Sequence, residues 1–200
     1  TSIGGAAFSD CASLTSVTIP DSVTSIGEQT FYNCRSLTSV AIPDSVTSIS
    51  RNTFAYCGSL TSVTIPDSVT SIVNGAFAYC TSLTSVTIPD SVTSIDNGAF
   101  ASCTSLTGIW VAEGNNDYSS DASGVLFNKD KITLVQCPGA FREYTIPDSV
   151  TSIVNGAFAY CASLTSVTIP DSVTSIGGDV FYYCTSLTDV YYAGSEAQWK

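Results

Sequence analysis

The chain has 200 residues, of which 17 are acidic and 6 are basic, and it contains no histidine, so its formal net charge is −11 at pH 7. A surface this acidic repels nucleic acids and anionic lipid headgroups, and we expect neither as a partner. No apolar run approaches the roughly 20 residues that a membrane-spanning helix needs, so membrane insertion is not expected either.

The sequence repeats itself from end to end. Leucines recur every 23 residues from Leu14 to Leu106, and Leu164 and Leu187 restore this step after one longer unit. A period of this size is typical of a solenoid, in which each repeat forms one coil and neighbouring coils bury its apolar side. We expect residues 1–200 to form a single solenoid. Because they begin partway through a repeat without a polar capping coil, we expect a portion of a longer array.

Each regular coil is predicted to contain one strand. In Ser62–Ile65, polar and apolar residues alternate, as in a half-buried strand with Val63 and Ile65 facing inward. Stacked coils place these strands side by side in a parallel sheet, with serine and threonine on the outer face. Pro66 then ends the strand because it has no N–H to donate, and Ile72 returns the chain to the core after a turn.

The end of each coil is predicted to be a short helical turn. Phe77 and Cys80 stand three residues apart, which places both on one face of such a turn, pointing inward. The tyrosines of these turns would lie near the outer surface, where packing over the next coil is favoured over partner binding. These tyrosines are Tyr32, Tyr56, Tyr79, Tyr160, Tyr182 and Tyr183.

Seven of the eight cysteines share one repeat position. Residues in such a column lie about 5 Å apart, a separation that permits disulfides. Because the column faces inward, we favour free thiols that pack as small apolar side chains, and pairing of some of them is the alternative. Cys137 lies one residue out of register and is predicted to be the most exposed thiol. The column comprises Cys11, Cys34, Cys57, Cys80, Cys103, Cys161 and Cys184.

The whole unit, L-x-x-V-x-I-P-D-S-V-x-x-I followed by A/T-F-x-x-C, resembles the BspA-type leucine-rich repeat across nearly the full chain. The resemblance implies a right-handed α/β solenoid with a parallel sheet on one face and short helical turns on the other. It also implies a secreted or cell-surface protein that adheres to host matrix proteins or to other cells. It supplies no catalytic residue.

The fifth coil departs from the repeat. Leu106 is followed after 35 residues, rather than 23, by Phe141 in the next leucine position, so we define residues 106–140 as a longer variant repeat. Within it, residues 124–135 form two apolar segments around a polar turn, which predicts a hairpin. The resemblance extends to this unit, so a purely structural variant is the alternative. Three of the six basic residues lie in or beside the hairpin, namely Lys129, Lys131 and Arg142.

Three substitutions break the uniform outer face of the predicted sheet. Trp110 and Tyr191 stand in a row otherwise made of threonine or alanine, and Glu143 interrupts the serine row. Binding energy concentrates in a few aromatic and arginine side chains, so we hypothesise a partner contact centred on Trp110, with Arg142, Glu143 and Lys129 at its rim and Tyr191 on the same face.

The last coil is also irregular. Val190 and Tyr192 keep the inward positions, and Trp199 falls where isoleucine normally stands. This segment is predicted to begin another variant coil or a cap.

A column of acidic residues at the strand ends raises the question of metal binding. Calcium needs six to eight oxygen ligands from several directions, whereas one column supplies one or two carboxylates per ion. We therefore predict no metal site and interpret the aspartates as turn formers that bond nearby N–H groups, with weak cation screening as the alternative. The column comprises Asp21, Asp44, Asp67, Asp90, Asp148, Asp171 and Glu113.

No sequence motif indicates catalysis. The chain lacks histidine, a G-x-S-x-G motif and a phosphate-binding loop, so we predict neither an enzyme nor a bound cofactor. We predict a non-catalytic binding or adhesion module, extracellular or at the cell surface, with an extracellular matrix or cell-surface protein or glycan as partner. The first alternative is a structural scaffold whose coil ends stack head to tail into a filament. The second is a serine and threonine array that faces carbohydrate or ice.

Overall fold

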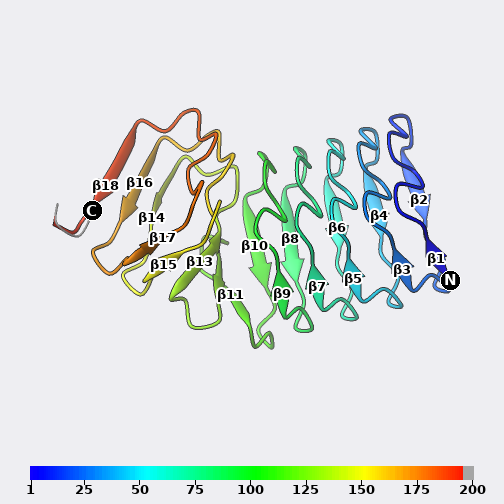
Figure 1. Ribbon diagram of the computed structural model, residues 1–200, viewed down its shortest axis with the longest axis horizontal. Helices are drawn as coiled ribbons and strands as arrows, with labels where there is room; N and C mark the ends of the chain where they lie inside the picture. The colour runs from blue at the N-terminus through cyan, green and yellow to red at the C-terminus, as the bar shows by residue number, and fades with distance from the viewer. Residues whose placement is uncertain (196–200) are drawn as a thin grey trace.

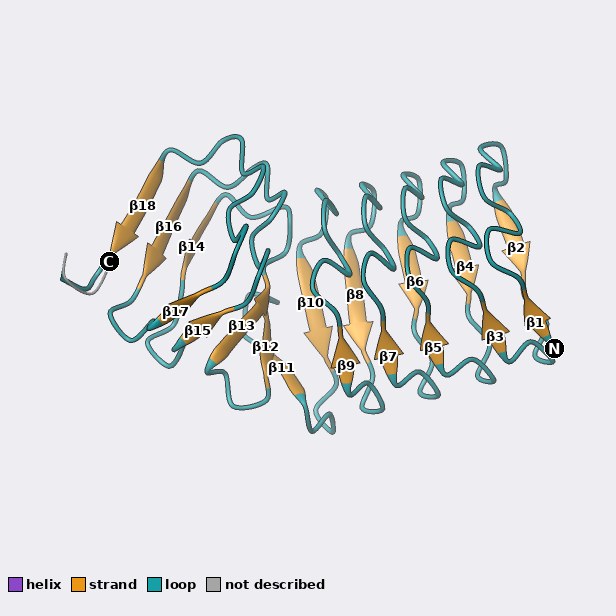
Figure 2. Cartoon of the chain, in the orientation of Figure 1, coloured by secondary structure: helices purple, strands orange, loops and turns teal. Residues whose placement is uncertain are grey.

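The computed structural model describes residues 1–195, so the interpretation of Trp199 lies outside the described residues. The molecule is an elongated stack of coils with the N-terminus at one end and the last described coil at the other (Figure 1). Two rows of short strands run along the stack (Figure 2). Equivalent residues of neighbouring regular coils are 23 positions apart in sequence, as between Ser39 and Ser62, which confirms the predicted period.

The first row of strands follows the alternating segment of each coil, and its parallel pairing confirms the prediction. Val63 is buried between the exposed Ser62 and Thr64, because strand side chains point alternately to opposite faces. The row forms three parallel sheets, ordered β2-β4-β6, β8-β10 and β14-β16-β18. Its strands are β2 (Ser16–Thr18), β4 (Ser39–Ala41), β6 (Ser62–Thr64), β8 (Ser85–Ile88), β10 (Gly108–Val111), β14 (Glu143–Thr145), β16 (Ser166–Ile169) and β18 (Asp189–Tyr192).

The second row was not predicted. Each member is a Ser-Ile pair, and in the inner coils, as in β7, the isoleucine is buried in the core, whereas Ile176 near the end of the stack is exposed. Two residues are too few to show an alternating pattern. These pairs form parallel ladders on the other side of the stack. The strands are β1 (Ser2–Ile3), β3 (Ser25–Ile26), β5 (Ser48–Ile49), β7 (Ser71–Ile72), β9 (Ser94–Ile95), β15 (Ser152–Ile153) and β17 (Ser175–Ile176).

The predicted helical turns are wrong, since residues 1–195 contain no helix and hence none that could cross a membrane. The N–H groups of Phe54 and Tyr56 donate instead to the carbonyls of Ala76 and Ala78 in the next coil, at 2.9 and 2.8 Å. Tyr56 has a φ of 62°, a left-handed backbone conformation that interrupts any helix. These segments are therefore successive turns bonded from coil to coil.

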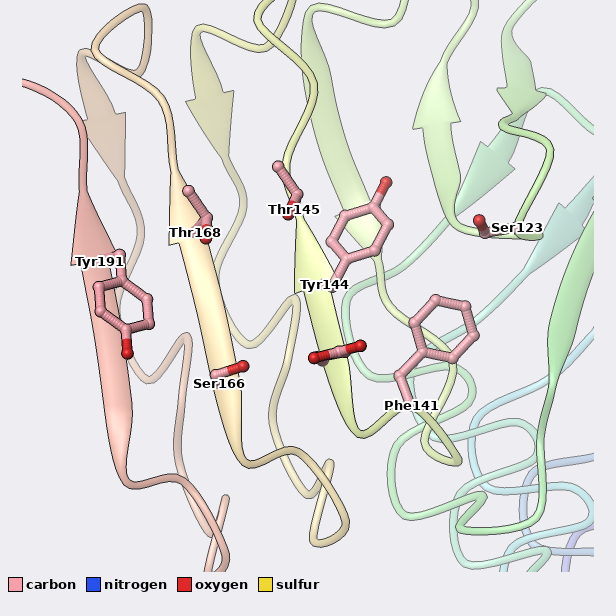
Figure 3. Close-up of a pocket in the computed structure, with 8 residues that line it drawn as sticks. Ser123, Phe141, Tyr144, Thr145, Ser166, Thr168 and Tyr191 are labelled. Carbon is pink, nitrogen blue, oxygen red and sulfur yellow. The ribbon is translucent and has the colours of Figure 1, made fainter.

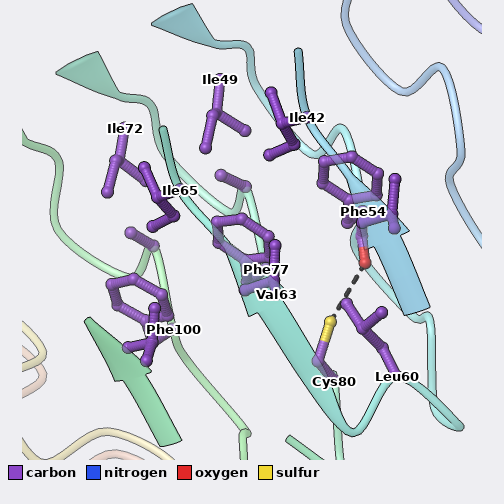
Figure 4. Close-up of a cluster of buried hydrophobic side chains, with 14 of the residues drawn as sticks. Ile42, Ile49, Phe54, Leu60, Val63, Ile65, Ile72, Phe77, Cys80 and Phe100 are labelled. Atoms are coloured by element: carbon purple, nitrogen blue, oxygen red, sulfur yellow. Dashed lines mark hydrogen bonds between the residues drawn. The ribbon is translucent and has the colours of Figure 1, made fainter. Parts of the chain in front are cut away.

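The core is a set of columns of identical side chains. Phe31, Phe54 and Phe77 are fully buried, and neighbouring rings lie 5.4 and 5.5 Å apart between centroids in nearly parallel planes. The Sγ of Cys80 lies 3.2 Å from the carbonyl oxygen of Phe54 in the coil before and donates to it (Figure 4). The thiol thus packs among apolar groups and also satisfies a buried carbonyl.

The cysteines are free thiols, but two expectations about their exposure are wrong. Cys137 is only 1% exposed, because its backbone N–H donates to Ala157 and its side chain joins the core of the last three coils. Cys11 is exposed, since no coil of this chain lies beyond it. Cys184, near the opposite end, is half-buried. Val190, which is in the last described coil and is predicted to face inward, is exposed, since no described coil packs over it.

The long variant repeat stands between two cores. It adds β11 (Tyr118–Ser120), β12 (Leu126–Asn128) and β13 (Thr133–Gln136), and the last two pair antiparallel within the segment that predicts a hairpin. β13 then pairs parallel with β15, so the second row resumes from the insertion in the sheet β11-β12-β13-β15-β17. Leu126 belongs to the core of the first coils, whereas Val125 and Phe127 belong to the core of the last coils. This strand is therefore a partition between two hydrophobic clusters.

Candidate functional site

The first row of strands is interrupted at the long repeat. β10 pairs with β8, but its other edge bonds to the variant repeat itself: the N–H of Ile109 donates to the carbonyl of Gly124 at 2.8 Å, and the N–H of Val111 donates to Ser120 Oγ at 3.2 Å. β14 pairs with β16, and no ladder joins β10 to β14 among residues 1–195. β14 is therefore an edge strand inside the array.

Tyr144 lies on the buried face of β14, beside the interruption. Its ring is 9% exposed, and its hydroxyl donates to Asp121 Oδ2 at 2.6 Å. Asp121 Oδ1 accepts from the N–H groups of Ser123 and Val125, both at 2.9 Å, so the carboxylate is held by the loop on the far side. Burial raises the pKa of Tyr144 above its ordinary value, and the hydrogen bond to Asp121 adds to this shift. Tyr144 is therefore a fixed donor that links β14 to the long repeat.

A groove of about 670 Å³ lies over this interruption and the outer face of the last three first-row strands (Figure 3). Its floor is polar, because Thr145, Thr168 and Tyr191 are in register across β14, β16 and β18. Tyr191 is 58% exposed. Such a surface offers hydroxyls for hydrogen bonding and aromatic rings for apolar contact. The lining residues are Ser123, Phe141, Glu143, Tyr144, Thr145, Ser166, Thr168 and Tyr191.

Of the five residues hypothesised to bind a partner, the groove brings together Glu143 and Tyr191 and leaves the others outside its lining. Trp110 is 41% exposed, and its indole lies over Gly108 and Gly124: a Cβ built on either would lie 2.7 or 3.2 Å from the ring. The two glycines therefore make room for the indole, which packs against the long repeat on one face and is open to solvent on the other.

The remaining two residues have different surroundings. Lys129 is exposed along its side chain, but its Nζ donates to the backbone carbonyl of Asn115. Asn115 is itself buried, and its Nδ2 donates to the carbonyls of Pro89 and Val92 at 2.8 and 2.9 Å. Lys129 therefore supports the turn that replaces Pro-Asp in the long repeat. Arg142 is exposed, and its carbonyl accepts from Thr165 N–H and from Thr165 Oγ1.

Sequence reasoning missed Phe141 and Tyr144 as parts of the site. Their rings lie 5.8 Å apart between centroids, and together they fill the side of the groove next to the long repeat. The available signal was a tyrosine in an inward position that is otherwise valine or, at Ile109, isoleucine. Its meaning depends on the missing ladder between β10 and β14, which no local pattern encodes.

The predicted tyrosine row is a continuous ridge on another edge of the stack. Ring centroids of Tyr56 and Tyr79 lie 4.2 Å apart in stacked geometry, and Tyr79 and Tyr160 meet edge-on at 5.6 Å across two coils that have no tyrosine at this repeat position. A hydrogen bond with Tyr79 raises the pKa of Tyr160 to about 12. The rings thus pack on one another, while Tyr183 at the end of the ridge stays 59% exposed.

The acidic column contains no metal centre among the described residues, where no group of three or more carboxylates and thiols could hold an ion. After five of the six aspartates, the next serine donates a side-chain hydrogen bond to the coil before it. Ser68 Oγ donates to the carbonyl of Val46 at 2.7 Å, and Ser91 Oγ donates to that of Val69 at 2.7 Å. These serines therefore tie their turns to the preceding coil.

Comparison with protein families identifies one matching model, the BspA type leucine rich repeat region, with six copies over residues 1–123 and 134–197. A comparison with curated proteins finds no significant match.

Among solved structures, the chain is similar to a leucine-rich repeat protein from Eubacterium ventriosum, with 27% identity, a TM-score of 0.69, and coverage of 90% of this chain and 60% of that one. A leucine-rich repeat protein from Bacteroides ovatus matches with 30% identity and a TM-score of 0.59, over 96% of this chain and 59% of that one. A leucine rich cell surface protein from Faecalibacterium prausnitzii matches with 27% identity and a TM-score of 0.51, over 100% and 84%. The chain thus spans about three fifths of the first two.

Proposed function

Because the chain belongs to the BspA-type leucine-rich repeat family, we propose that it is a non-catalytic binding module that acts outside the cell or at its surface and adheres to a protein or glycan partner. Two findings support this proposal. A cell-surface leucine-rich repeat protein from Faecalibacterium prausnitzii shares its fold at 27% identity. No metal-binding cluster occurs among residues 1–195, and the sequence carries no catalytic motif.

The groove over β14, β16 and β18 is the single observation that carries the proposal. The regular coils present the same serine and threonine side chains at every step, and such a lattice cannot fix the position of a partner along the stack. In the groove, Glu143 and Tyr191 add a charge and an aromatic ring to this lattice. Exposed aromatic rings are among the side chains on which binding energy concentrates.

The test is direct binding of the immobilised chain to purified extracellular matrix proteins and to a glycan array. With any partner so found, Tyr191→Ala should weaken binding about tenfold, because exposed aromatic anchors contribute at least this much. The matched control is Tyr183→Ala, since Tyr183 is equally exposed but lies on the tyrosine ridge outside the groove lining. A loss of affinity in Tyr183→Ala alone would show that the partner binds the tyrosine ridge rather than the groove.

Trp110 is tested with a separate variant because the sequence places it at the centre of the hypothesised partner contact. Its indole lies beside the interruption but outside the groove lining. We expect Trp110→Ala to weaken partner binding only if the partner extends from the groove over the long repeat. If both the affinity and the unfolding midpoint fall together, the indole contributes packing rather than recognition.

Head-to-tail assembly is the second candidate function. The end coils of this chain expose apolar side chains that are buried in every inner coil, namely Phe8 at one end and Val190 at the other. Sedimentation velocity over a range of concentrations tests this proposal. Assembly predicts species that grow with concentration and that disappear in Phe8→Asp, whereas a constant sedimentation coefficient contradicts it.

A further inference from the structure

We propose that the open edge of β14 binds an extended peptide segment with a basic side chain, which adds to the sheet as a strand in the place that the ladder leaves open. The inference rests on the proposed binding function and specifies its partner as an unfolded or loop segment of a protein. Addition of a strand to an exposed sheet edge is a general mode of peptide recognition, in which main-chain hydrogen bonds supply affinity and side-chain contacts supply selectivity.

The backbone of β14 has unused hydrogen-bonding groups on one side. In a parallel ladder, alternate residues bond to one neighbour. The carbonyl of Arg142 accepts from Ser166 N–H, and the N–H of Ile146 donates to the carbonyl of Thr168 at 3.0 Å. By the same alternation, the backbone N–H and C=O of Tyr144, in the middle of β14, also face β16. Glu143 and Thr145 therefore direct their N–H and C=O groups toward the interruption. Among the described residues, no protein group bonds to them there.

These groups are accessible to a ligand. Glu143 and Thr145 are both exposed, and both line the groove. The long repeat does not use them, because Gly124 and Ser120 bond instead to the facing edge of β10. An unpaired strand edge of this kind is a template for another chain. Its three residues span about 10 Å, which is the length over which a short peptide would pair.

The charge of the groove selects a basic peptide. Glu143 is the one charged side chain among the lining residues of this groove. Through the register, it is aligned with Ser166 and then with Asp189, so a second carboxylate stands two strands away, at about 10 Å by strand spacing. A peptide residue directly opposite Glu143 would present its side chain on the same face, and opposite charges in such pairs are favourable.

The neighbouring positions define the rest of the peptide. The residue opposite Tyr144 would face inward, toward the rings of Tyr144 and Phe141, and so favours an apolar side chain. The residue opposite Thr145 would face outward toward a row of hydroxyls and an exposed tyrosine. The expected pattern is therefore basic, then apolar, then hydroxyl-bearing or aromatic.

Fluorescence anisotropy with a labelled Ser-Lys-Val-Thr-Val-Ser peptide tests the inference on the full chain. Two further peptides carry N-methyl groups on alternate residues. In the first peptide, they replace the N–H hydrogens that would face β14, and in the second they replace those that would face away from β14. The first peptide should bind about tenfold or more weakly than the unmodified peptide and the second should not, because only the first loses intermolecular hydrogen bonds. Equal affinities of the two N-methylated peptides would overturn the proposal.

Variants of the chain locate the edge. Thr145→Pro removes the N–H that faces the groove and leaves the ladder to β16 intact, so it should weaken binding of the unmodified peptide about tenfold, because one hydrogen bond to a peptide carbonyl is lost. The matched control is Thr18→Pro, since Thr18 occupies the same position in β2, which pairs on one side with β4. If Thr18→Pro rather than Thr145→Pro abolishes peptide binding, the peptide adds to the end of the stack and the proposal is wrong.

Glu143→Lys tests the charge preference and does not depend on a proline. It should weaken binding of the lysine peptide and strengthen that of a glutamate peptide, as expected when an opposite-charge pair is exchanged. Unchanged affinity for both would refute the basic preference. If matrix proteins bind the chain but the N-methylated peptides bind equally, the strand-addition inference fails and the proposed function stands. If the peptide binds as expected and no matrix component does, the strand-addition inference stands and the proposed adhesion to matrix components fails.

Discussion

At the scale of single residues, Tyr144 controls the geometry of the groove. Its hydroxyl spans the interruption to Asp121, and no other side-chain hydrogen bond in the described residues joins β14 to the long repeat. A valine, which is the residue of the regular coils at this position, could not make this bond.

Tyr144→Phe should therefore lower the free energy of unfolding by about 1 to 3 kcal/mol, because it removes the donor from a partly buried carboxylate oxygen. Urea unfolding followed by circular dichroism measures the change. Tyr191→Phe is the control: its ring is exposed on the same face, and we expect a change within about 0.5 kcal/mol. Equal midpoints for the two variants would mean that the hydrogen bond to Asp121 contributes nothing.

The buried thiols make stability depend on pH in the alkaline range. Burial raises the pKa of Cys57 and Cys103 from 9.0 to about 12. In the unfolded chain these thiols lose their protons near pH 9, whereas in the folded chain they keep them up to about pH 12. Between these values the unfolded state binds fewer protons, so the stabilisation present below pH 9 is lost progressively as pH rises.

We expect the free energy of unfolding to fall by about 1.4 kcal/mol per pH unit for each such thiol once the unfolded form is ionised. Urea titrations at pH 8, 10 and 11 with a reductant present measure the slope. The double variant Cys57→Ala and Cys103→Ala should show a shallower slope than the unchanged chain. A slope that does not respond to these substitutions would show that other groups are responsible.

At the scale of elements, the phenylalanine column distinguishes the inner from the outer face of each coil. Phe77 is fully buried, and its ring stacks at 5.5 Å on the rings of both Phe54 and Phe100. Phe77→Ala should therefore destabilise the fold by about 3 to 5 kcal/mol. Thr64→Ala, on the exposed face of β6, should cost under about 1 kcal/mol. The urea unfolding midpoints of the two variants are compared, and similar midpoints would contradict this assignment of the inner and outer faces.

Elements differ in how well the sequence predicts them. The first-row strands were predicted because Ser62–Ile65 carries a full period of alternation in every regular coil. The second-row strands were missed because a Ser-Ile pair carries no period. The turns were mistaken for helices because Phe77 and Cys80 have helical spacing, whereas the N–H of Phe77 donates to Ala99 of the next coil. That bond is long-range, and local spacing does not reveal it.

The candidate site was predictable only in part, for a related reason. Glu143 and Tyr191 were found because they depart from the repeat on its exposed face, which a single coil is enough to show. The groove itself arises because 12 additional residues fill the position beside β10 and leave the edge of β14 open. That outcome depends on how two distant strands pair, and no pattern within either strand specifies it.

At the scale of the whole molecule, the net charge of −11 acts on stability as well as on partner choice. Carboxylates recur at the same turn of successive coils, and like charges at this spacing repel one another unless salt screens them. We expect the thermal unfolding midpoint to rise between about 0.01 and 0.5 M sodium chloride, because the Debye length falls from roughly 30 Å to a few ångströms over this range. A midpoint independent of salt would show that the acidic column is already well solvated.

The near-identity of the regular coils has a consequence for how such an array can vary in length. Coils with β4, β6 and β8 present almost the same upper and lower surfaces, so unequal recombination that deletes or duplicates one 23-residue unit would join compatible neighbours. The long repeat is unique in the chain, and such exchange would leave it intact. Each gain or loss would move the groove by about 4.8 Å relative to the far end of the stack, without altering the side chains that line it.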